Sequence, residues 1–243
     1  MLRRVLTARL QAVLRTRRAS SGFRPVIGIE CHVQLNTPTK AFCRCAPSTT
    51  APPNTRVCGV CLGEPGSLPV ASTDAPLLGL KAAVALDCED LSETLEWDRK
   101  NYQYPDLPKG YQITQARTPL ARSGKVKIDD SVIRITSLHL EEDSAKTTDV
   151  LDHNRAGVAL AEIVTEPDLR SGKEAAAFVR ELQQVVKRCG ASLGRMEHGE
   201  MRVDVNVSVT RDGEARERVE LKNLNSLRAV RLACDFELRR QAF

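Results

Sequence analysis

The chain has 243 residues, of which 42% are hydrophobic and 28% are charged, and its formal net charge is +5 at pH 7. This length supports one large domain or two small ones, and no apolar run reaches the roughly 20 residues of a membrane-spanning helix, so we expect no membrane partner. The excess of cations lies in residues 1–20, and the rest of the chain is close to neutral. The net charge therefore does not by itself indicate an acidic partner.

Residues 1–20 have the composition of a targeting segment. They contain six arginines and no acidic residue, and their apolar residues follow helical spacing. An arginine-rich, acid-free amphipathic segment is typical of a mitochondrial transit peptide, whereas a secretory signal needs a continuous apolar stretch. We expect this segment to direct the protein to the mitochondrial matrix. A basic arm that binds nucleic acid is the alternative.

Residues 26–35 predict a β-strand with two different faces. Apolar residues alternate with Gly28, Glu30, His32 and Gln34. A period of two places the apolar set against a core and the polar set on the opposite face. Exposure to solvent is the ordinary reason for a polar face, but such faces are usually rich in Lys, Thr and Ser. The acid and the imidazole make Glu30 and His32 candidate site residues.

Residues 42–63 have the sequence FCRCAPSTTAPPNTRVCGVCLG, which contains a C-x-C pair and a C-x-x-C pair. The spacing is close to that of a zinc ribbon, and an internal compartment argues against two structural disulfides. We predict a zinc knuckle in which Cys43, Cys45, Cys58 and Cys61 bind a structural Zn²⁺ ion. Four protein ligands close the coordination sphere, which excludes zinc catalysis. Four free thiols are the alternative.

The next two segments are predicted to differ in regularity. Residues 74–86 predict a helix with Asp74 as its N-cap and Pro76 in its first turn. Residues 97–112 hold the only Trp and all three Tyr of the chain, mixed with basic residues and prolines, and predict an irregular loop. Aromatic rings beside Arg and Lys suit stacking on a base, and a packed surface loop is the alternative.

Residues 137–143, with the sequence SLHLEED, place a histidine before three consecutive acids at the end of an apolar, β-branched run. Neighbouring carboxylates repel one another, so they must be solvated, paired with cations or bound to a metal. Carboxylate oxygens with an occasional imidazole suit Mg²⁺ or Mn²⁺, and Mg²⁺ bound in this way usually also binds substrate phosphates. We interpret this triplet as part of a metal site for nucleotide chemistry.

The remaining elements complete an α+β fold. Residues 160–166, 201–209 and 219–223 repeat the alternation of the first strand, with acids, amides and bases on their polar faces. Helices are predicted over 172–189, with Glu174 in the first turn, and over 226–243. A helix of this kind covers the apolar face of an antiparallel sheet and leaves the polar face open as a cleft.

Taken together, these motifs resemble the B subunit family of glutamyl-tRNA(Gln) amidotransferases, which comprises GatB and its archaeal relative GatE. The resemblance runs from about residue 26 to residue 241 through VIGIECHVQLNT, VCGVCLGEPGSLPV, DRKNYQYPDLPKGYQITQ, LHLEED, NRAG, EIVTEPDLRS, VDVNVSV and ELKNLNS. It implies a catalytic cradle domain over residues 21–243, with an antiparallel sheet similar to that of glutamine synthetase. The helical and tail domains of full-length members are expected to be absent from this C-terminally shortened chain.

The resemblance also implies a reaction. Mg²⁺ and ATP convert the γ-carboxylate of Glu-tRNA(Gln) to an acyl phosphate, and ammonia from the A subunit then displaces the phosphate to give Gln-tRNA(Gln) for mitochondrial translation. The partners are the A and C subunits of a heterotrimer. The implied metal ligands are Glu30, His32, Glu141, Glu142 and Glu162, and the four cysteines match a zinc site that some members carry.

On the neighbouring strand faces, we assign phosphate-holding roles toward ATP to Arg202, Asn206, Lys222 and Asn223. Two other functions remain open from the sequence. The first alternative is a non-catalytic, zinc-containing RNA-binding or assembly module whose acids are surface charge. The second is an autonomous enzyme, similar to glutamine synthetase, that uses free glutamate.

Overall fold

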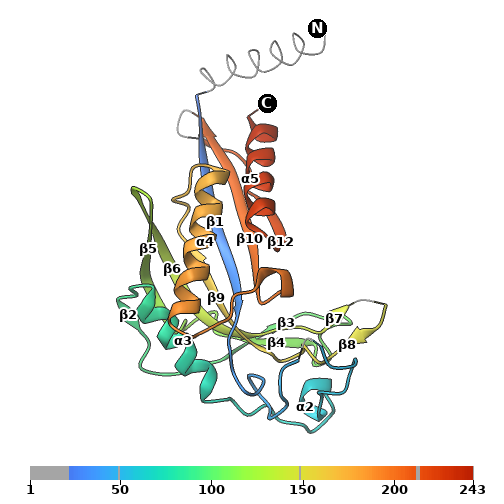
Figure 1. Ribbon diagram of the computed structural model, residues 1–243. Helices are drawn as coiled ribbons and strands as arrows, with labels where there is room; N and C mark the ends of the chain where they lie inside the picture. The colour runs from blue at the N-terminus through green and yellow to red at the C-terminus, as the bar shows by residue number, and fades with distance from the viewer. Residues whose placement is uncertain (1–21, 49, 148, 212–213, 243) are drawn as a thin grey trace.

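The computed structural model describes residues 22–48, 50–147, 149–211 and 214–242, so the transit peptide predicted over residues 1–20 lies outside the described residues. The described chain is built on an eight-stranded sheet with the order β11-β10-β1-β9-β6-β5-β2, and β12 also pairs with β10. Each pair in this sheet is antiparallel, which confirms the predicted α+β class. Figure 1 shows the long strands β1 and β10 running side by side through the upper part of the molecule.

The strands of the main sheet differ greatly in length. The long central strands are β1 (Phe23–Gln34), β5 (Ala121–Ile128), β6 (Ser131–Glu142), β9 (Ala159–Thr165) and β10 (Met201–Arg211). The shorter strands are β2 (Asp90–Leu91), β11 (Glu214–Ala215) and β12 (Val219–Leu224). Two separate two-stranded sheets join β3 (Asp98–Asn101) to β4 (Tyr111–Thr114) and β7 (Lys146–Thr147) to β8 (Leu151–Asp152).

One face of the sheet forms the core. In β1, the side chains of Ile27, Ile29, Cys31 and Val33 are at most 1% exposed, and the alternate residues are more accessible. β10 repeats the pattern with its valines buried. Because antiparallel pairing keeps the faces in register, the apolar residues of neighbouring strands form one continuous surface. The predicted alternation is therefore confirmed.

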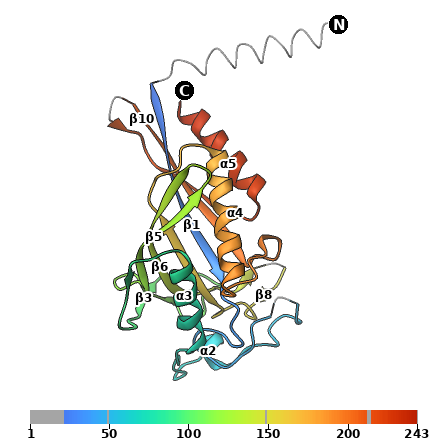
Figure 2. The same cartoon turned by 60° about the vertical axis from the view of Figure 1, so that its left-hand side comes forward.

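Helices cover this apolar face, as Figures 1 and 2 show. α4 (Gly172–Arg188) and α5 (Leu227–Gln241) lie against each other, and α5 packs on β10. The N-cap of α4 is Ser171, whose hydroxyl accepts the Glu174 N–H, while the Glu174 carboxylate accepts the Arg170 N–H. This reciprocal cap fixes the start of the predicted helix, and its apolar stripe, which includes Phe178 and Leu182, is fully buried.

Two local predictions need correction. The helix predicted over 74–86 is α3 (Asp74–Ala85), but its N-cap is Thr73, and Asp74 is already helical. The irregular loop predicted over 97–112 is wrong at its ends, because β3 and β4 pair there as an antiparallel hairpin. Pro105 and Pro108 lie in the connecting loop, where a missing N–H breaks no strand ladder.

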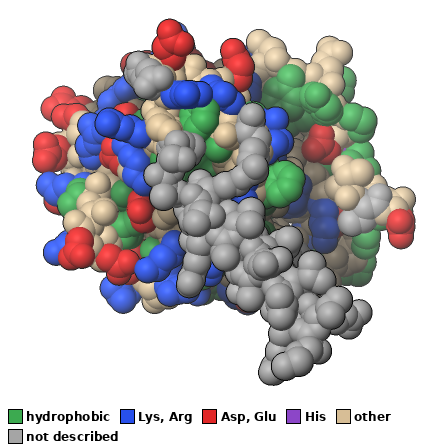
Figure 3. Space-filling view, turned by 90° about the horizontal axis from the view of Figure 1, so that it is seen from above, with side chains coloured by type: hydrophobic (Ala, Val, Ile, Leu, Met, Phe, Trp, Pro, Cys, Tyr) green, Lys and Arg blue, Asp and Glu red, His purple; other side chains and the backbone are tan. Residues whose placement is uncertain are grey.

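The surface of the upper end of the molecule is mixed in character. Figure 3 shows Lys, Arg, Asp and Glu side chains interspersed over one half of this end, with hydrophobic side chains gathered at the opposite edge. Among the described residues, no helix combines the length and apolar composition needed to cross a membrane.

Candidate functional site

Strand pairing brings polar side chains together on the face of the sheet opposite α4 and α5. The register places His32 opposite Glu162 of β9 and Arg202 of β10, and it places Glu162 opposite His139 of β6. Four strands that are far apart in the sequence therefore contribute to one surface. The prediction that these strands share a polar face is confirmed by their pairing.

The centre of this surface is a group formed by His32, Glu141 and Glu162, which we call the acid–imidazole group. One possible ligand atom from each residue lies within 4.8 Å of the other two. His32 Nδ1 lies 2.8 Å from Glu141 Oε1, and His139 Nε2 lies 2.8 Å from Glu162 Oε2. On its other side, His32 Nε2 lies 3.6 Å from Asp204 Oδ2.

The charges of this group are strongly coupled. Burial lowers the pKa of His32, but hydrogen bonds with Asp204 and Glu141 outweigh burial and raise that pKa to about 10. Burial raises the pKa of Glu162, but the hydrogen bond from His139 and the charges of both histidines lower it to about 2. Without a cation, a protonated His32 compensates the neighbouring carboxylates.

The donor set fits a hard divalent cation. Two carboxylates and one imidazole converge, and Glu141 is buried while the other two are half-buried. Mg²⁺ and Mn²⁺ favour oxygen ligands with an occasional imidazole, and a histidine ligand must lose its proton to bind. Such an ion would replace the proton of His32 as the positive charge of the group.

Glu30 adjoins this group along β1. It lies two residues before His32 on the same face and opposite Asp204 of β10. Its Oε1 accepts a hydrogen bond from Asn206 Nδ2 at 2.8 Å. The structure therefore places Glu30 beside the acid–imidazole group, bound to one of the predicted phosphate-holding residues.

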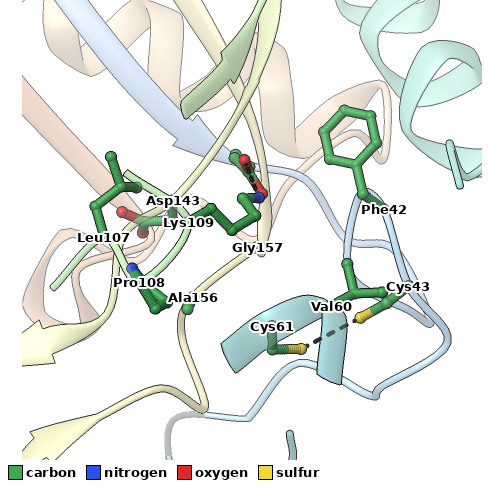
Figure 4. A pocket seen from close by; sticks show the side chains of 11 residues that line it. Phe42, Cys43, Val60, Cys61, Leu107, Pro108, Lys109, Asp143, Ala156 and Gly157 are labelled. Carbon is green, nitrogen blue, oxygen red and sulfur yellow. Dashed lines mark hydrogen bonds and ion pairs between the residues drawn. The ribbon is translucent and has the colours of Figure 1, made fainter. Parts of the chain in front are cut away.

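Glu142 points away from the acid–imidazole group. Adjacent strand residues point to opposite faces, and the Glu142 carboxylate is paired with Lys109 and accepts the Ile113 N–H at 3.0 Å. This pair lines a small pocket together with Cys43 and Cys61. Figure 4 shows Lys109, Cys43 and Cys61 in this pocket. The structure does not bring Glu142 together with the other predicted metal ligands.

Two predicted phosphate-holding side chains already have ionic partners. Both terminal nitrogens of Arg202 donate to Asp143, at 2.9 and 3.0 Å. Lys222 is exposed and pairs with Glu220 at 3.1 Å. Asn223 donates its backbone N–H to Asp204 at 2.6 Å, while its side chain is exposed. The Asp143 carboxylate therefore already compensates the charge of Arg202.

The four cysteines of the predicted knuckle converge beside the pocket of Figure 4. One sulfur atom from each lies within 4.8 Å of the others, and Cys61 Sγ is 3.4 Å from Cys43 Sγ and 3.8 Å from Cys58 Sγ. A hydrogen bond from Cys43 and the charge of Lys40 lower the pKa of Cys61 to about 4, against the effect of burial. Four convergent sulfurs with a ready thiolate fit a structural zinc ion.

Lys40 supports this cysteine group from within the protein. Its side chain is 0% exposed, and its Nζ donates to Cys61 Sγ at 3.3 Å and to the His153 carbonyl at 3.0 Å. A buried ammonium needs an anionic or strongly polar partner. The thiolate provides one, and the contact with His153 ties the knuckle to the turn before β9.

Some aromatic side chains of residues 97–112 pack against the protein, and another is exposed to solvent. Trp97 packs edge-to-face on Phe42 with ring centroids 5.0 Å apart, whereas Tyr104 is 64% exposed. Arg99 lies over the ring of Tyr111 at 4.8 Å. Within this segment, Tyr104 is the ring most accessible for the predicted base stacking.

Sequence reasoning missed several participants. His139 and Asp204 lie on polar strand faces that were already identified, so the alternation of β6 and β10 was a signal that could have included them. Lys40 and Lys109 come from loops, where no periodic pattern predicts the direction of a side chain. Their roles follow only from the tertiary structure.

Comparison with known proteins shows the family to which the sequence belongs. The family model described as the GatB/GatE catalytic domain matches residues 25–243. The B subunit of the chloroplastic/mitochondrial glutamyl-tRNA(Gln) amidotransferase of Sorghum bicolor is 47% identical over 239 residues, which cover 91% of this chain and 43% of the relative. The B subunit of the aspartyl/glutamyl-tRNA(Asn/Gln) amidotransferase of Persephonella marina is 48% identical over 231 residues, with coverages of 90% and 48%.

A third relative gives the same result. The B subunit of the chloroplastic/mitochondrial glutamyl-tRNA(Gln) amidotransferase of Ostreococcus lucimarinus is 47% identical over 246 residues, which cover 93% of this chain and 49% of the relative. The chain thus spans about half the length of the curated relatives that it matches.

Proposed function

The chain belongs to the family of the GatB/GatE catalytic domain, and we propose from this that it carries the phosphorylation site of a glutamyl-tRNA(Gln) amidotransferase. The substrates are ATP and Glu-tRNA(Gln), and the product after amidation is Gln-tRNA(Gln). The single observation that carries the proposal is the acid–imidazole group on the open polar face of the sheet.

The reaction requires charge compensation more than covalent catalysis. An oxygen of the glutamyl γ-carboxylate forms a bond to the γ-phosphorus of ATP while the bond to the β,γ-bridging oxygen breaks and ADP leaves. Both reactants are anions, so their approach is opposed by Coulomb repulsion. The attacking oxygen belongs to the substrate, and the protein therefore supplies no nucleophile. Ammonia from a partner protein then attacks the acyl phosphate and expels phosphate.

Each residue of the site has a defined task in this proposal. His32, Glu141 and Glu162 hold a divalent cation, while Asp204 orients His32 and His139 orients Glu162. When bound there, Mg²⁺ neutralises phosphate charge. Glu30 lies two residues before His32 on the same face of β1 but outside the three converging residues, so it would have to turn toward them to complete the ligand set implied by the family resemblance. Glu142 would have to leave Lys109 to join it.

The predicted phosphate-holding residues extend this surface across two more strands. Asn206 lies on β10, and Lys222 and Asn223 lie on β12, which pairs with β10. Arg202 adds a guanidinium, of which two N–H groups bond Asp143. These four side chains contact phosphate oxygens of ATP in the proposal.

The remaining parts of the proposal concern assembly and location. The knuckle binds structural zinc, and the partners are the A and C subunits, of which A supplies the ammonia. The names of the Sorghum and Ostreococcus relatives support an organellar site, which we take to be the mitochondrial matrix, reached through a transit peptide over residues 1–20.

The direct test is ATP-dependent phosphorylation of Glu-tRNA(Gln) by the full chain combined with A and C subunits. Glu141→Gln keeps the side-chain volume but removes a ligand charge, so the rate should fall on the order of a hundredfold. Glu93→Gln makes the same change at an exposed position and should leave the rate unchanged. Equal rates in wild type and Glu141→Gln would reject the proposed site. Binding of tRNA without any phosphorylation would favour the non-catalytic RNA-binding module.

A further inference from the structure

We propose that Cys43 and Cys61 are a site of reversible oxidation, at which hydrogen peroxide joins the two sulfur atoms in a disulfide, expels the zinc ion and loosens the ion pair between Lys109 and Glu142. The inference goes beyond the proposed reaction and rests only on the zinc knuckle of the proposed function. In addition to its structural role, the knuckle then senses peroxide.

The positions of the sulfur atoms are the first argument. Cys61 Sγ lies 3.4 Å from Cys43 Sγ and 3.8 Å from Cys58 Sγ, so Cys43 is the closer of these two partners. Figure 4 shows the sulfur atoms of Cys43 and Cys61 facing each other. Cross-linking brings them from this distance to the roughly 2 Å of a disulfide bond, which is a small displacement for two side chains.

The charge beside Cys61 is the second argument. Lys40 Nζ donates to Cys61 Sγ at 3.3 Å, and the Lys40 side chain is fully buried. An ammonium group without access to water stabilises a thiolate beside it, and the thiolate is the form of cysteine that forms disulfides. Cys61 therefore stays a nucleophile after an oxidised neighbour has left the zinc ion.

Solvent access to the other cysteines is the third argument. Cys61 is buried, whereas Cys43, Cys45 and Cys58 are partly exposed. Cysteines that respond to peroxide combine solvent access with a second cysteine that closes the disulfide. Cys43 is therefore the residue on which peroxide acts, and Cys61 is the residue that closes the bond.

The reaction balances with hydrogen peroxide as the oxidant. The Cys43 thiolate attacks one peroxide oxygen, the O–O bond breaks, and Cys43 becomes a sulfenic acid as hydroxide leaves. The Cys61 thiolate then attacks the Cys43 sulfur, forms the S–S bond and displaces a second hydroxide. Each sulfur loses one electron, and peroxide gains both. The zinc ion loses two of its four ligands and dissociates.

The backbone of the knuckle carries this change toward Glu142. Cys61 lies in α2 (Gly59–Leu62), whose C-cap is Gly63. A Cβ added to Gly63 would lie 2.9 Å from the Lys109 backbone nitrogen, so the two segments are in direct contact. Lys109 is the residue that pairs with Glu142. A shift of Cys61 therefore moves the segment that presents Lys109.

Lys40 provides a second route to the same carboxylate. When Cys61 enters the disulfide, the buried ammonium of Lys40 loses its anionic partner, and a buried charge needs another. A Cβ built on Gly157 would lie 3.7 Å from both Lys40 Cδ and Glu142 Oε2, so these two side chains are neighbours. After oxidation, Glu142 is therefore an anion within reach of Lys40, in competition with Lys109.

The test treats the full, zinc-loaded chain with stoichiometric hydrogen peroxide. A chromophoric indicator measures the released zinc, and peptide mapping after alkylation of free thiols identifies the disulfide. We expect one zinc ion released for each disulfide between Cys43 and Cys61, and recovery of the zinc site with a thiol reductant and added zinc. Cys88→Ser removes a half-buried cysteine outside the knuckle and, as the matched control, should release zinc like the wild type.

Acetylation of lysine side chains, read by mass spectrometry, tests the connection to Glu142. The Lys109 side chain is only 10% exposed in its pair with Glu142, so its labelling should rise several-fold on oxidation and fall again on reduction. Lys125 of β5, with 49% exposure, is the internal reference and should be labelled equally in both states. Unchanged labelling of Lys109 in the oxidised chain would overturn the connection to Glu142.

The remaining outcomes separate this inference from the proposed function. Retention of zinc in peroxide, a disulfide between other cysteines, or oxidation to sulfinic acids without a disulfide would overturn the inference alone. A chain that holds no zinc before treatment would reject the zinc knuckle, and the inference would fail with it. Phosphorylation of Glu-tRNA(Gln) decides the proposed reaction independently of these results.

Discussion

The pKa of His32 is strongly raised, because its imidazole lies between the carboxylates of Glu141 and Asp204. Its raised pKa has two consequences. The protonated imidazole stabilises the folded state fully below its unfolded pKa of about 6.5, and this contribution is lost as the pH rises toward 10. A divalent cation must displace the same proton, so metal binding near neutral pH should release a proton.

We therefore expect the His32 resonances of the zinc-loaded protein, prepared without Mg²⁺ or Mn²⁺, to titrate well above pH 8 in an NMR pH series. Asp204→Asn removes one of the two carboxylates that raise this pKa and should lower it. A His32 midpoint close to 6.5, the ordinary value of a histidine, would contradict the described ion pairing.

Lys40 gives a second prediction at the level of single residues. Its buried ammonium donates to Cys61, so it compensates the negative charge of a zinc ion with four thiolates. Lys40→Met keeps most of the side-chain volume and removes the charge, and zinc affinity should fall roughly ten- to a hundredfold, as for other residues that support metal ligands. Competition with a chromophoric chelator measures this. Lys127→Met, at an exposed position of β5, is the control. Unchanged zinc affinity in Lys40→Met would remove the proposed role.

The alternation of the strands explains which parts of the site were predictable. A period of two identified the polar face of β1, and the same period holds in β6. Glu141 and Glu142 are adjacent, so they had to point to opposite faces, and the structure places them in different environments. Treating the acid triplet as one unit did not use this constraint. The pattern within β6 was sufficient to separate the two carboxylates.

Local sequence patterns could not predict the hairpin of β3 and β4 or its contacts. The pairing of β3 with β4 joins residues on either side of a proline-containing loop, and neither four-residue strand shows a clear alternation. The pairing of Glu142 with Lys109 depends on where this hairpin packs on β6. Such contacts are set by tertiary structure, which a short sequence window does not record.

The knuckle formed by the four cysteines is the element whose stability we expect to depend most on a bound ion. It has one short helix, α2 (Gly59–Leu62), and few buried apolar residues of its own. Metal binding free energy is then folding free energy for this segment. Cys58→Ser should abolish stoichiometric zinc and lower the melting temperature, by about 2–4 °C for each kcal/mol lost in a chain of this size.

Metal analysis and differential scanning calorimetry test this prediction. Cys88→Ser, a half-buried cysteine outside the knuckle, is the matched control and should retain zinc. Purified protein without zinc, together with an unchanged melting temperature in Cys58→Ser, would favour four free thiols.

In the described structure, the two faces of the main sheet differ: one packs in the core, and the other carries the charged side chains of the candidate site. Helices cover the apolar face, and the polar face remains available along β9, β1 and β10. This arrangement explains how a chain of modest size keeps a continuous core while it presents a group of charged side chains. It also predicts that changes on the polar face affect ligand binding more than folding.

The central claim is that His32, Glu141 and Glu162 bind a catalytic divalent cation. Electron paramagnetic resonance of Mn²⁺ with the full, zinc-loaded chain measures this directly. We predict one Mn²⁺ site that Mg²⁺ displaces, with affinity at least tenfold lower in Glu141→Gln and in Glu162→Gln and unchanged in Glu93→Gln. Glu142→Gln should have the smaller effect, because its carboxylate is paired with Lys109. Equal Mn²⁺ affinity in wild type, Glu141→Gln and Glu162→Gln would contradict the account.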